Sequence, residues 1–176
     1  MVMVSPPAKA RIWAIAIALL TLILGWCGAI APAAAQLKEY PPPTSYSNAE
    51  LSRRDFSKQT LRGAEFTNAN LSYAKFIDAQ AQAAAFSGSL LKETDLSGAD
   101  LTYALMDSVK FIGTNFTNTV LTEALLLGSE FRDVQITGAD FDGALLDGYQ
   151  QKQLCAIASG TNPTTGIATR DSLGCP

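Results

Sequence analysis

Histidine is absent from this chain of 176 residues. The commonest general base and the commonest metal ligand of proteins are therefore both missing. The chain also has no phosphate-binding loop and no glycine-rich dinucleotide signature in a suitable context. Lysine and arginine (13) are fewer than aspartate and glutamate (16), and they form no basic stripe that could neutralise phosphates. We therefore expect no enzyme, no metal, no cofactor, no small-molecule substrate and no nucleic-acid partner.

The carboxylates offer no convincing catalytic pair either. Asp95 with Asp100, and Asp140 with Asp142, are the nearest approaches to paired acids. Each occupies a position expected on a convex outer surface, where no cleft would raise a carboxyl pKa. Solvated surface positions are the better account, and no catalytic residue is predicted.

Cysteine is scarce, and one of the three lies in a distinct N-terminal segment. Lys9 and Arg11 precede an uncharged apolar run, and Ala33-x-Ala35 stands before Gln36. This order predicts a secretory signal peptide over residues 1–35, with the mature chain beginning at Gln36. The alternative is an uncleaved membrane anchor, because the uncharged stretch is long enough to span a bilayer. Pro32 and the small residues before Gln36 favour cleavage, and the absence of twin arginines favours the general export route.

Removal of Lys9 and Arg11 leaves 13 − 2 = 11 basic residues against 16 acidic ones, a net charge of −5. That charge is too small for a polyanion mimic. Cys155 and Cys175 remain, and a cysteine pair in an oxidising compartment predicts a disulfide. A redox-active pair is the alternative, but the twenty-residue spacing provides no CxxC arrangement.

A five-residue repeat dominates the rest of the chain. In "TDLSGADLTYALMDSVKFIG", residues 94–113, a large apolar residue recurs at every fifth position. The same register runs from Leu51 to Leu146 without an insertion, and only Ala81 is undersized. We call these positions the centres. A small residue usually stands two places before each centre, and glycine is frequent two places after it.

This period is neither helical nor that of a half-buried strand. In an extended segment the small residue and the centre point to the same side, so both can enter an interior if the chain turns before the next repeat. A positive φ two places after the centre, which glycine or asparagine accepts, permits such a turn. Four turns close a coil of twenty residues, so twenty repeats predict an all-β solenoid of about five coils.

The pattern A-[DN]-L-x-x in "ANLSY", "ADLTY" and "ADFDG" resembles the pentapeptide-repeat family. The resemblance covers residues 49–148 and implies a right-handed quadrilateral β-helix. The tail that follows Leu146 further resembles the pentapeptide-repeat proteins of the cyanobacterial and chloroplast thylakoid lumen. In those proteins a short helical cap pinned by a disulfide ends the repeats, and Cys155 and Cys175 match its cysteines.

The segments outside the repeat have their own signals. Residues 36–48 form a Pro-rich leader, predicted to be a flexible or docked arm. Residues 149–176 form the predicted cap, because a solenoid must cover its terminal coil. Asp147 and Gln150 predict a capping box, "YQQKQLCAIAS" a helix ended by Gly160, and "TRDSL" one further helical turn.

Function in such a solenoid must come from its outer walls. One outward column alternates between Asp55, Lys75 and Asp95, as a solvated surface would. Another column is anomalous, because apolar residues replace the usual polar ones. Its members, with one neighbour on the same wall, form the leucine stripe: Leu105, Leu125, Leu127 and Leu145. Either the cap or the arm covers this stripe, or it is a docking face for a partner.

These observations predict a non-catalytic, exported protein-binding or assembly module, monomeric and acting on an unidentified protein through its outer walls. The partner could be a membrane complex that faces the lumen. The resemblance of the tail implies the thylakoid lumen as the location, and the periplasm is the alternative. A DNA-mimicking topoisomerase inhibitor of the same fold is the alternative function. It would require a cytoplasmic location, a dimer and a strongly negative wall, and the export signal and modest charge disfavour it.

Overall fold

The computed structural model describes residues 44–176. The predicted signal peptide, residues 1–35, and residues 36–43 of the predicted leader lie outside this range. The rest of the predicted leader, residues 44–48, is docked on the solenoid. The backbone N–H of Glu65 donates to the carbonyl oxygen of Thr44 at 3.0 Å, and that of Tyr46 donates to the carbonyl oxygen of Glu65 at 2.6 Å. Backbone pairing between the coils therefore begins at residue 44, inside the predicted leader.

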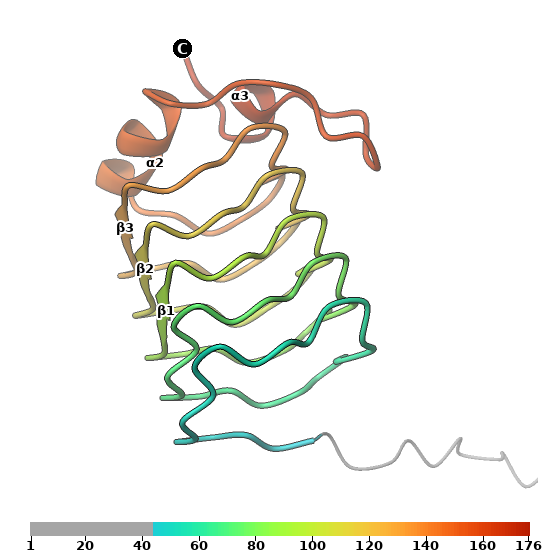
Figure 1. The fold of residues 1–176 in the computed structure, drawn as a ribbon. Helices are drawn as coiled ribbons and strands as arrows, with labels where there is room; N and C mark the ends of the chain where they lie inside the picture. The colour runs from blue at the N-terminus through green and yellow to red at the C-terminus, as the bar shows by residue number, and fades with distance from the viewer. Residues whose placement is uncertain (1–43) are drawn as a thin grey trace, which may run out of the picture. The chain divides into compact units, whose positions relative to one another are not determined.

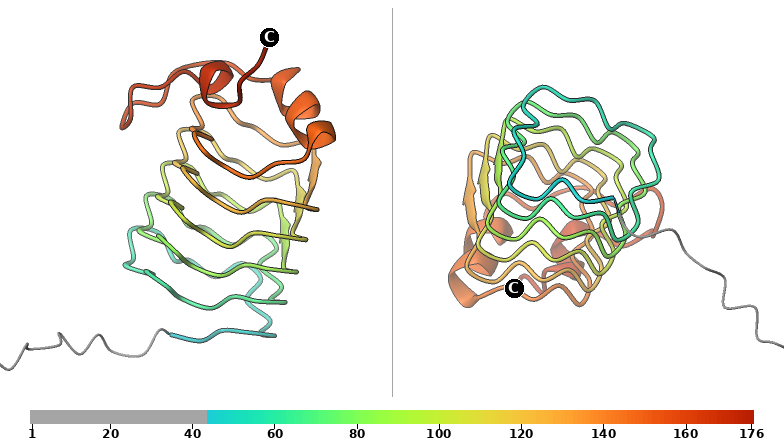
Figure 2. Two further views of the ribbon diagram at one scale, coloured as in Figure 1. Left: turned by 180° about the vertical axis from the view of Figure 1, so that it is seen from behind. Right: turned by 90° about the horizontal axis from the view of Figure 1, so that it is seen from below.

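Residues 44–147 wind into stacked coils that pair in parallel with a register of twenty residues (Figure 1). Three short strands form one parallel sheet in the order β1 (Leu90–Lys92), β2 (Lys110–Ile112), β3 (Glu130–Arg132). Elsewhere the pairing consists of single bridges, such as Asp55 with Lys75. A view along the stack shows the four-sided outline of the coils (Figure 2).

The four sides stack into four walls, which we number by their centres. Wall 1 has the centres Leu51, Leu71, Leu91, Phe111 and Phe131. Wall 2 has Phe56, Phe76, Leu96, Phe116 and Ile136. Wall 3 has Leu61, Ala81, Leu101, Leu121 and Phe141. Wall 4 has Tyr46, Phe66, Phe86, Met106, Leu126 and Leu146.

The centres fill a single interior column. All of them from Leu51 to Phe141 are buried. In the first coils aromatic rings stack along the axis, with centroids 5.1 Å apart for Tyr46 and Phe66 and 4.9 Å for Phe66 and Phe86. Buried hydroxyls two places before a centre donate to carbonyl oxygens of the previous coil, as Thr94 does to Leu71 at 2.9 Å. The interior therefore holds polar atoms whose hydrogen bonds are satisfied.

The corners have the predicted backbone conformation. The residue two places after each centre has a positive φ in every repeat from Asn48 to Gly143, including bulky residues such as Tyr103 at 60°. The next coil holds this conformation, since the Tyr103 N–H donates to the carbonyl oxygen of Thr122 at 3.0 Å. Stacking therefore imposes on tyrosine or lysine a conformation that sequence preference reserves for glycine or asparagine.

The final coil is covered by residues 148–176 (Figure 1). Helix α2 (Gly148–Cys155) begins with the predicted capping box of Asp147 and Gln150, which is confirmed. It ends at Cys155, so the prediction that it continues to Gly160 is wrong. After Cys155 the backbone hydrogen bonds join residues three apart, as that of the Ile157 N–H to the carbonyl oxygen of Leu154 does. The chain then meets the last coil, where the N–H of Gly138 donates to the carbonyl oxygen of Ser159 at 2.8 Å. Helix α3 (Thr169–Ser172) matches the further helical turn predicted in "TRDSL".

Within residues 44–176 no helix has the length and apolar character needed to cross a membrane.

Candidate binding surface on wall 4

The structure gives the carboxylates local roles. Asp95 accepts a hydrogen bond from the backbone N–H of Ser97 at 3.0 Å, and Asp100 accepts one from that of Thr102 at 3.1 Å. The structure does not bring this pair together as an acid–base site, since each carboxylate bonds its own turn. No group of three or more potential metal-ligating side chains occurs in the part of the chain that the structure describes.

Two carboxyl groups near the open end of the solenoid have shifted pKa values. Hydrogen bonds from the side chains of Ser52 and then Asn70 hold the pKa of Glu50 below its usual value. Ser57, whose backbone N–H donates to the Asp55 carboxylate at 2.9 Å, lowers the pKa of Asp55 in the same way. Both carboxylates are fully solvated and are stabilised in their charged form, which is not the behaviour of a general acid.

Asp140 corrects one prediction from the sequence. It was expected on a solvated wall, but its side chain is fully buried, whereas Asp142 is exposed. Only one of its carboxylate oxygens has a partner in the structure, the N–H of Asp142 at 2.9 Å. The cap segment lies over this last coil, and no five-residue pattern could reveal that cover.

The leucine stripe lies on wall 4, in register. Leu105, Leu125 and Leu145 pair as successive parallel bridges in three neighbouring coils. Leu105 is 46 % exposed, Leu145 56 % and Leu127 43 %, while Leu125 is half-buried. The cap covers the end of the solenoid and leaves these side chains open. The hypothesis that the cap covers the stripe is therefore wrong, and residues 36–43, the other proposed cover, lie outside the described residues.

Two exposed tyrosines lie near this surface, and neither belongs to the predicted stripe. Tyr103, at the corner that leads into wall 4, is 60 % exposed and stands two residues before Leu105. Tyr149, at the start of α2, is also exposed and lines a hollow of about 460 Å³ with Gly128, which is the corner that leaves wall 4. Tyr103 could have been found, because a tyrosine at a position that prefers glycine is unusual.

The charges on this wall all have one sign. Wall 4 and its two corners, from residue 63 to residue 147, contain no lysine or arginine. They contain Glu65, Asp107, Glu123 and Asp147. Among residues 44–176 the structure has one salt bridge, between Arg132 and Glu130 on wall 1, so no basic side chain neutralises these four carboxylates. The surface is an apolar stripe with an acidic border.

A family model for pentapeptide repeats matches eight copies over residues 49–88, 82–118 and 110–148. The chain belongs to the pentapeptide-repeat family. Proteins of this family fold as right-handed quadrilateral β-helices, and the four walls agree with that architecture. The match covers the predicted repeat region, residues 49–148.

Three proteins to which the chain is similar come from the thylakoid lumen. A solved structure of a pentapeptide-repeat protein from the Arabidopsis thaliana thylakoid lumen is 40 % identical, with a TM-score of 0.73 over 74 % of this chain and 90 % of that one. Thylakoid lumenal protein TL20.3 of A. thaliana is 56 % identical over 41 residues, 23 % of this chain and 15 % of that protein. Thylakoid lumenal 15 kDa protein 1 is 49 % identical over 47 residues, 27 % of this chain and 21 % of that protein.

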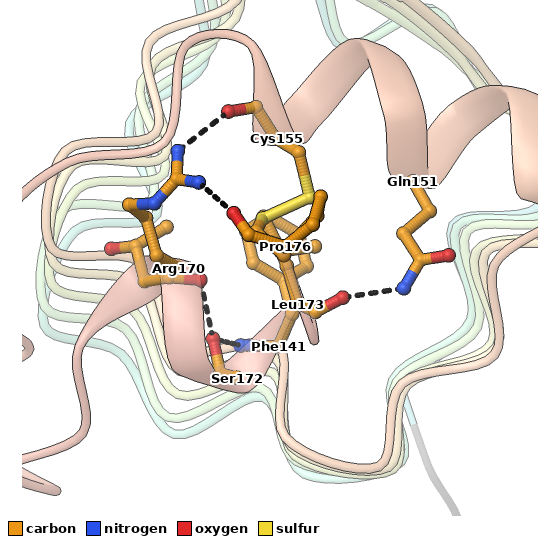
Figure 3. The surroundings of a disulfide bond; sticks show 9 residues. Phe141, Gln151, Cys155, Arg170, Ser172, Leu173 and Pro176 are labelled. Atoms are coloured by element: carbon orange, nitrogen blue, oxygen red, sulfur yellow. Dashed lines mark hydrogen bonds between the residues drawn. A yellow bond between two sulfur atoms is a disulfide. The ribbon is translucent and has the colours of Figure 1, made fainter.

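A disulfide bond and the hydrogen bonds around it join the parts of the cap of this pentapeptide-repeat protein (Figure 3). Cys155, at the end of α2, and Cys175 are joined through their sulfur atoms, with Cα atoms 5.6 Å apart. Arg170 donates to the carbonyl oxygens of Cys155 at 3.2 Å and Pro176 at 2.7 Å. The Ser172 hydroxyl accepts a hydrogen bond from the N–H of Phe141 at 3.0 Å, which fixes this cluster to the last coil. The bond and these hydrogen bonds hold the cap on the last coil.

Proposed function

We propose that this protein is a non-catalytic binding or assembly module of the thylakoid lumen, and that it engages a protein partner through wall 4. The observation that carries the proposal is the exposure of Leu105, Leu127 and Leu145 together on one wall of the solenoid. A contiguous exposed apolar patch rimmed by polar residues is typical of an interaction site.

Three further features support the proposal. The relatives named above are thylakoid lumenal proteins, which supports the lumen over the periplasm. The expected signal peptide is consistent with export. Proteins of this family are in general structural or binding proteins, not enzymes, and the isolated carboxylates of this chain fit that role. No observation favours the DNA-mimicking alternative, because the walls other than wall 4 carry charges of both signs.

The test replaces Leu105 and Leu145 by aspartate, because these are the two most exposed members of the stripe. Exposed substitutions of this kind change the free energy of unfolding by about 0.5 kcal/mol or less. We expect the double variant to keep its melting temperature and to lose the partner that the wild type cross-links in intact thylakoids.

The matched control replaces Gln80 on wall 3 and Gln135 on wall 2 by aspartate. Both glutamines are exposed, so this variant adds the same charge away from the stripe. It should retain the partner. Two results count against the proposal: a Leu105→Asp/Leu145→Asp protein that keeps every partner of the wild type, and one that unfolds because the leucines are buried in the mature protein.

A further inference from the structure

The charge pattern of wall 4 narrows the chemistry of its partner. We propose, on the basis of the function proposed above, that wall 4 binds a basic amphipathic helix, whose apolar face covers the leucine stripe and whose lysine or arginine side chains meet the acidic border. The partner is thus defined by an apolar stripe with cations along both sides.

The acidic border of wall 4 favours a partner of opposite charge. Asp107, which is half-buried, directly follows the wall 4 centre Met106. Glu123, which is exposed, stands at the corner that leads into wall 4. Asp147 stands at the end of the same wall and is also exposed. No cation of the described chain neutralises them, and no basic residue occurs on this wall or its corners. A partner with like charge would be repelled, whereas a basic partner would be attracted and held in register.

The spacing of the leucines matches the spacing of side chains along a helix. Leu105, Leu125 and Leu145 occupy successive coils, so their spacing is the strand-pairing distance of about 4.8 Å. A helix that lies along the solenoid axis presents apolar side chains once per turn, about every 5.4 Å. Over three leucines the difference is only about 1.2 Å, which side-chain rotamers can absorb. Helical anchors at i, i+3 or i+4, and i+7 therefore match the stripe.

A tyrosine with a fixed backbone lies at the edge of the leucine stripe. Tyr103 is the most exposed large side chain on wall 4 and its corners. Its backbone is held at a φ of 60° by the coil above, so the side chain is presented from a fixed position. A tyrosine fixed in this way contributes apolar area and a hydroxyl at a small entropic cost, which suits an interface anchor.

The experiment uses two synthetic helical peptides of about fifteen residues, the length at which isolated helices become stable. Both have leucine at the i, i+3, i+4 and i+7 positions. One has lysine at the flanking positions and the other has glutamate. Calorimetry and fluorescence anisotropy measure the binding of each to the full mature chain. We expect the lysine peptide to bind at least about ten-fold more tightly than the glutamate peptide, with an affinity that falls as salt is added.

Two variants of the protein locate the binding. Replacing Leu105 and Leu145 by serine should weaken binding of the lysine peptide by about ten-fold or more, since the apolar contact is lost. Replacing Asp107 by Asn and Glu123 by Gln should weaken it by about three- to ten-fold and flatten the salt dependence. The control Asp78→Asn removes one exposed carboxylate from a corner of the opposite wall. It should leave the affinity within about two-fold of the wild type.

The outcomes separate the two proposals. If both peptides bind equally and both depend on Leu105 and Leu145, the proposal that wall 4 is a docking surface is supported, and the proposal of a basic partner is excluded. If the affinity of the lysine peptide is the same for every wall 4 variant, or if neither peptide binds, this inference fails. That conclusion does not depend on the result of the thylakoid cross-linking. If the wild type self-associates in sedimentation through Leu105 and Leu145, a second copy occupies the wall and the basic helix is again excluded.

Discussion

The side-chain amide of Gln150 donates to the backbone carbonyl oxygen of Leu126 at 2.8 Å. The same amide nitrogen also donates to the carbonyl oxygen of Ser129 at 2.8 Å. One coil earlier, the Ser129 hydroxyl donates to the carbonyl oxygen of Met106, and the N–H of Glu130 to that of Val109. Gln150 therefore supplies from one side chain the two donors that a further coil would provide, and so leaves these two carbonyl groups paired at the end of the stack.

Replacing Gln150 by alanine should lower the free energy of unfolding by roughly 2–4 kcal/mol, because two buried carbonyl groups lose their donors. The Gln150 side chain also accepts from the N–H of Asp147 at 2.7 Å and is buried, so it has three bonds to lose. Chemical denaturation measures the effect. Gln153→Ala on the exposed side of α2 should cost far less, and equal losses at the two positions would contradict this account.

Gly160 should tolerate alanine poorly. Its φ is 79°, and a Cβ at this position would lie 2.9 Å from the backbone nitrogen of Gly138. Gly166 has a similar φ of 74°, but a Cβ there would have no neighbour within 4 Å. Gly166→Ala therefore measures the backbone strain alone, about 1–2 kcal/mol. Gly160→Ala should lower the melting temperature further, because the close approach of cap and coil is also lost. A smaller effect at Gly160 than at Gly166 would refute this contact.

The period of five was enough to predict the register and the corners, because each repeat has its own local signal. It could not locate the first coil. Tyr46 follows three prolines and lacks the repeat consensus, yet its ring stacks on Phe66 at an interplanar angle of 11°. That pairing joins positions twenty residues apart and has no local signal.

The sequence also located the leucine stripe but not its full extent. Leu105, Leu125 and Leu145 follow from counting in twenties, and Leu127 stands on the same wall, whereas the burial of Asp140 depends on what the cap covers. The cap meets the last coil through contacts such as that of the Asn162 amide with the carbonyl oxygen of Gly138, at 2.9 Å. Such contacts follow no repeat and required the structure.

The bond between Cys155 and Cys175 should stabilise the cap. It closes a loop with a sequence separation of 20. In the chain-entropy model such a closure is worth about 3 kcal/mol. Replacing both cysteines by alanine should lower the melting temperature by several degrees and leave the β-rich circular dichroism spectrum of the coils unchanged. An identical melting temperature with and without a reductant would show that the cap is held by its hydrogen bonds alone.

Glu50 should titrate below the usual range of glutamate. The largest cause is the Ser52 side chain, followed by the Asn70 side chain, whose amide donates to the carboxylate at 3.0 and 2.8 Å, and by the N–H of Ser52 at 3.2 Å. Because these bonds lower its pKa in the folded state, its contribution to stability is present above the unfolded pKa, about 4.3, and is lost as the pH falls through the folded value. NMR titration should show the pKa of Glu50 rising toward its ordinary value in Ser52→Ala and Asn70→Ala, while the pKa of Asp55, on wall 2, stays low.

Ala81 is the one small centre, and enlarging it tests the interior of the solenoid. In its own coil the rings of Phe76 and Phe86 meet with centroids 5.8 Å apart. In the coil below, Phe56 and Phe66 meet at 5.5 Å although Leu61 occupies the place equivalent to Ala81. The aromatic pair is therefore compatible with a leucine on wall 3.

We expect Ala81→Leu to be neutral or to stabilise the protein, since it adds buried apolar area, whereas Leu101→Ala one coil above should cost roughly 2–5 kcal/mol. Equilibrium denaturation of the two variants measures both effects. Overpacking of a filled core costs about 1–3 kcal/mol. A loss of that size in Ala81→Leu would show that neighbouring side chains have already moved into the space beside Ala81.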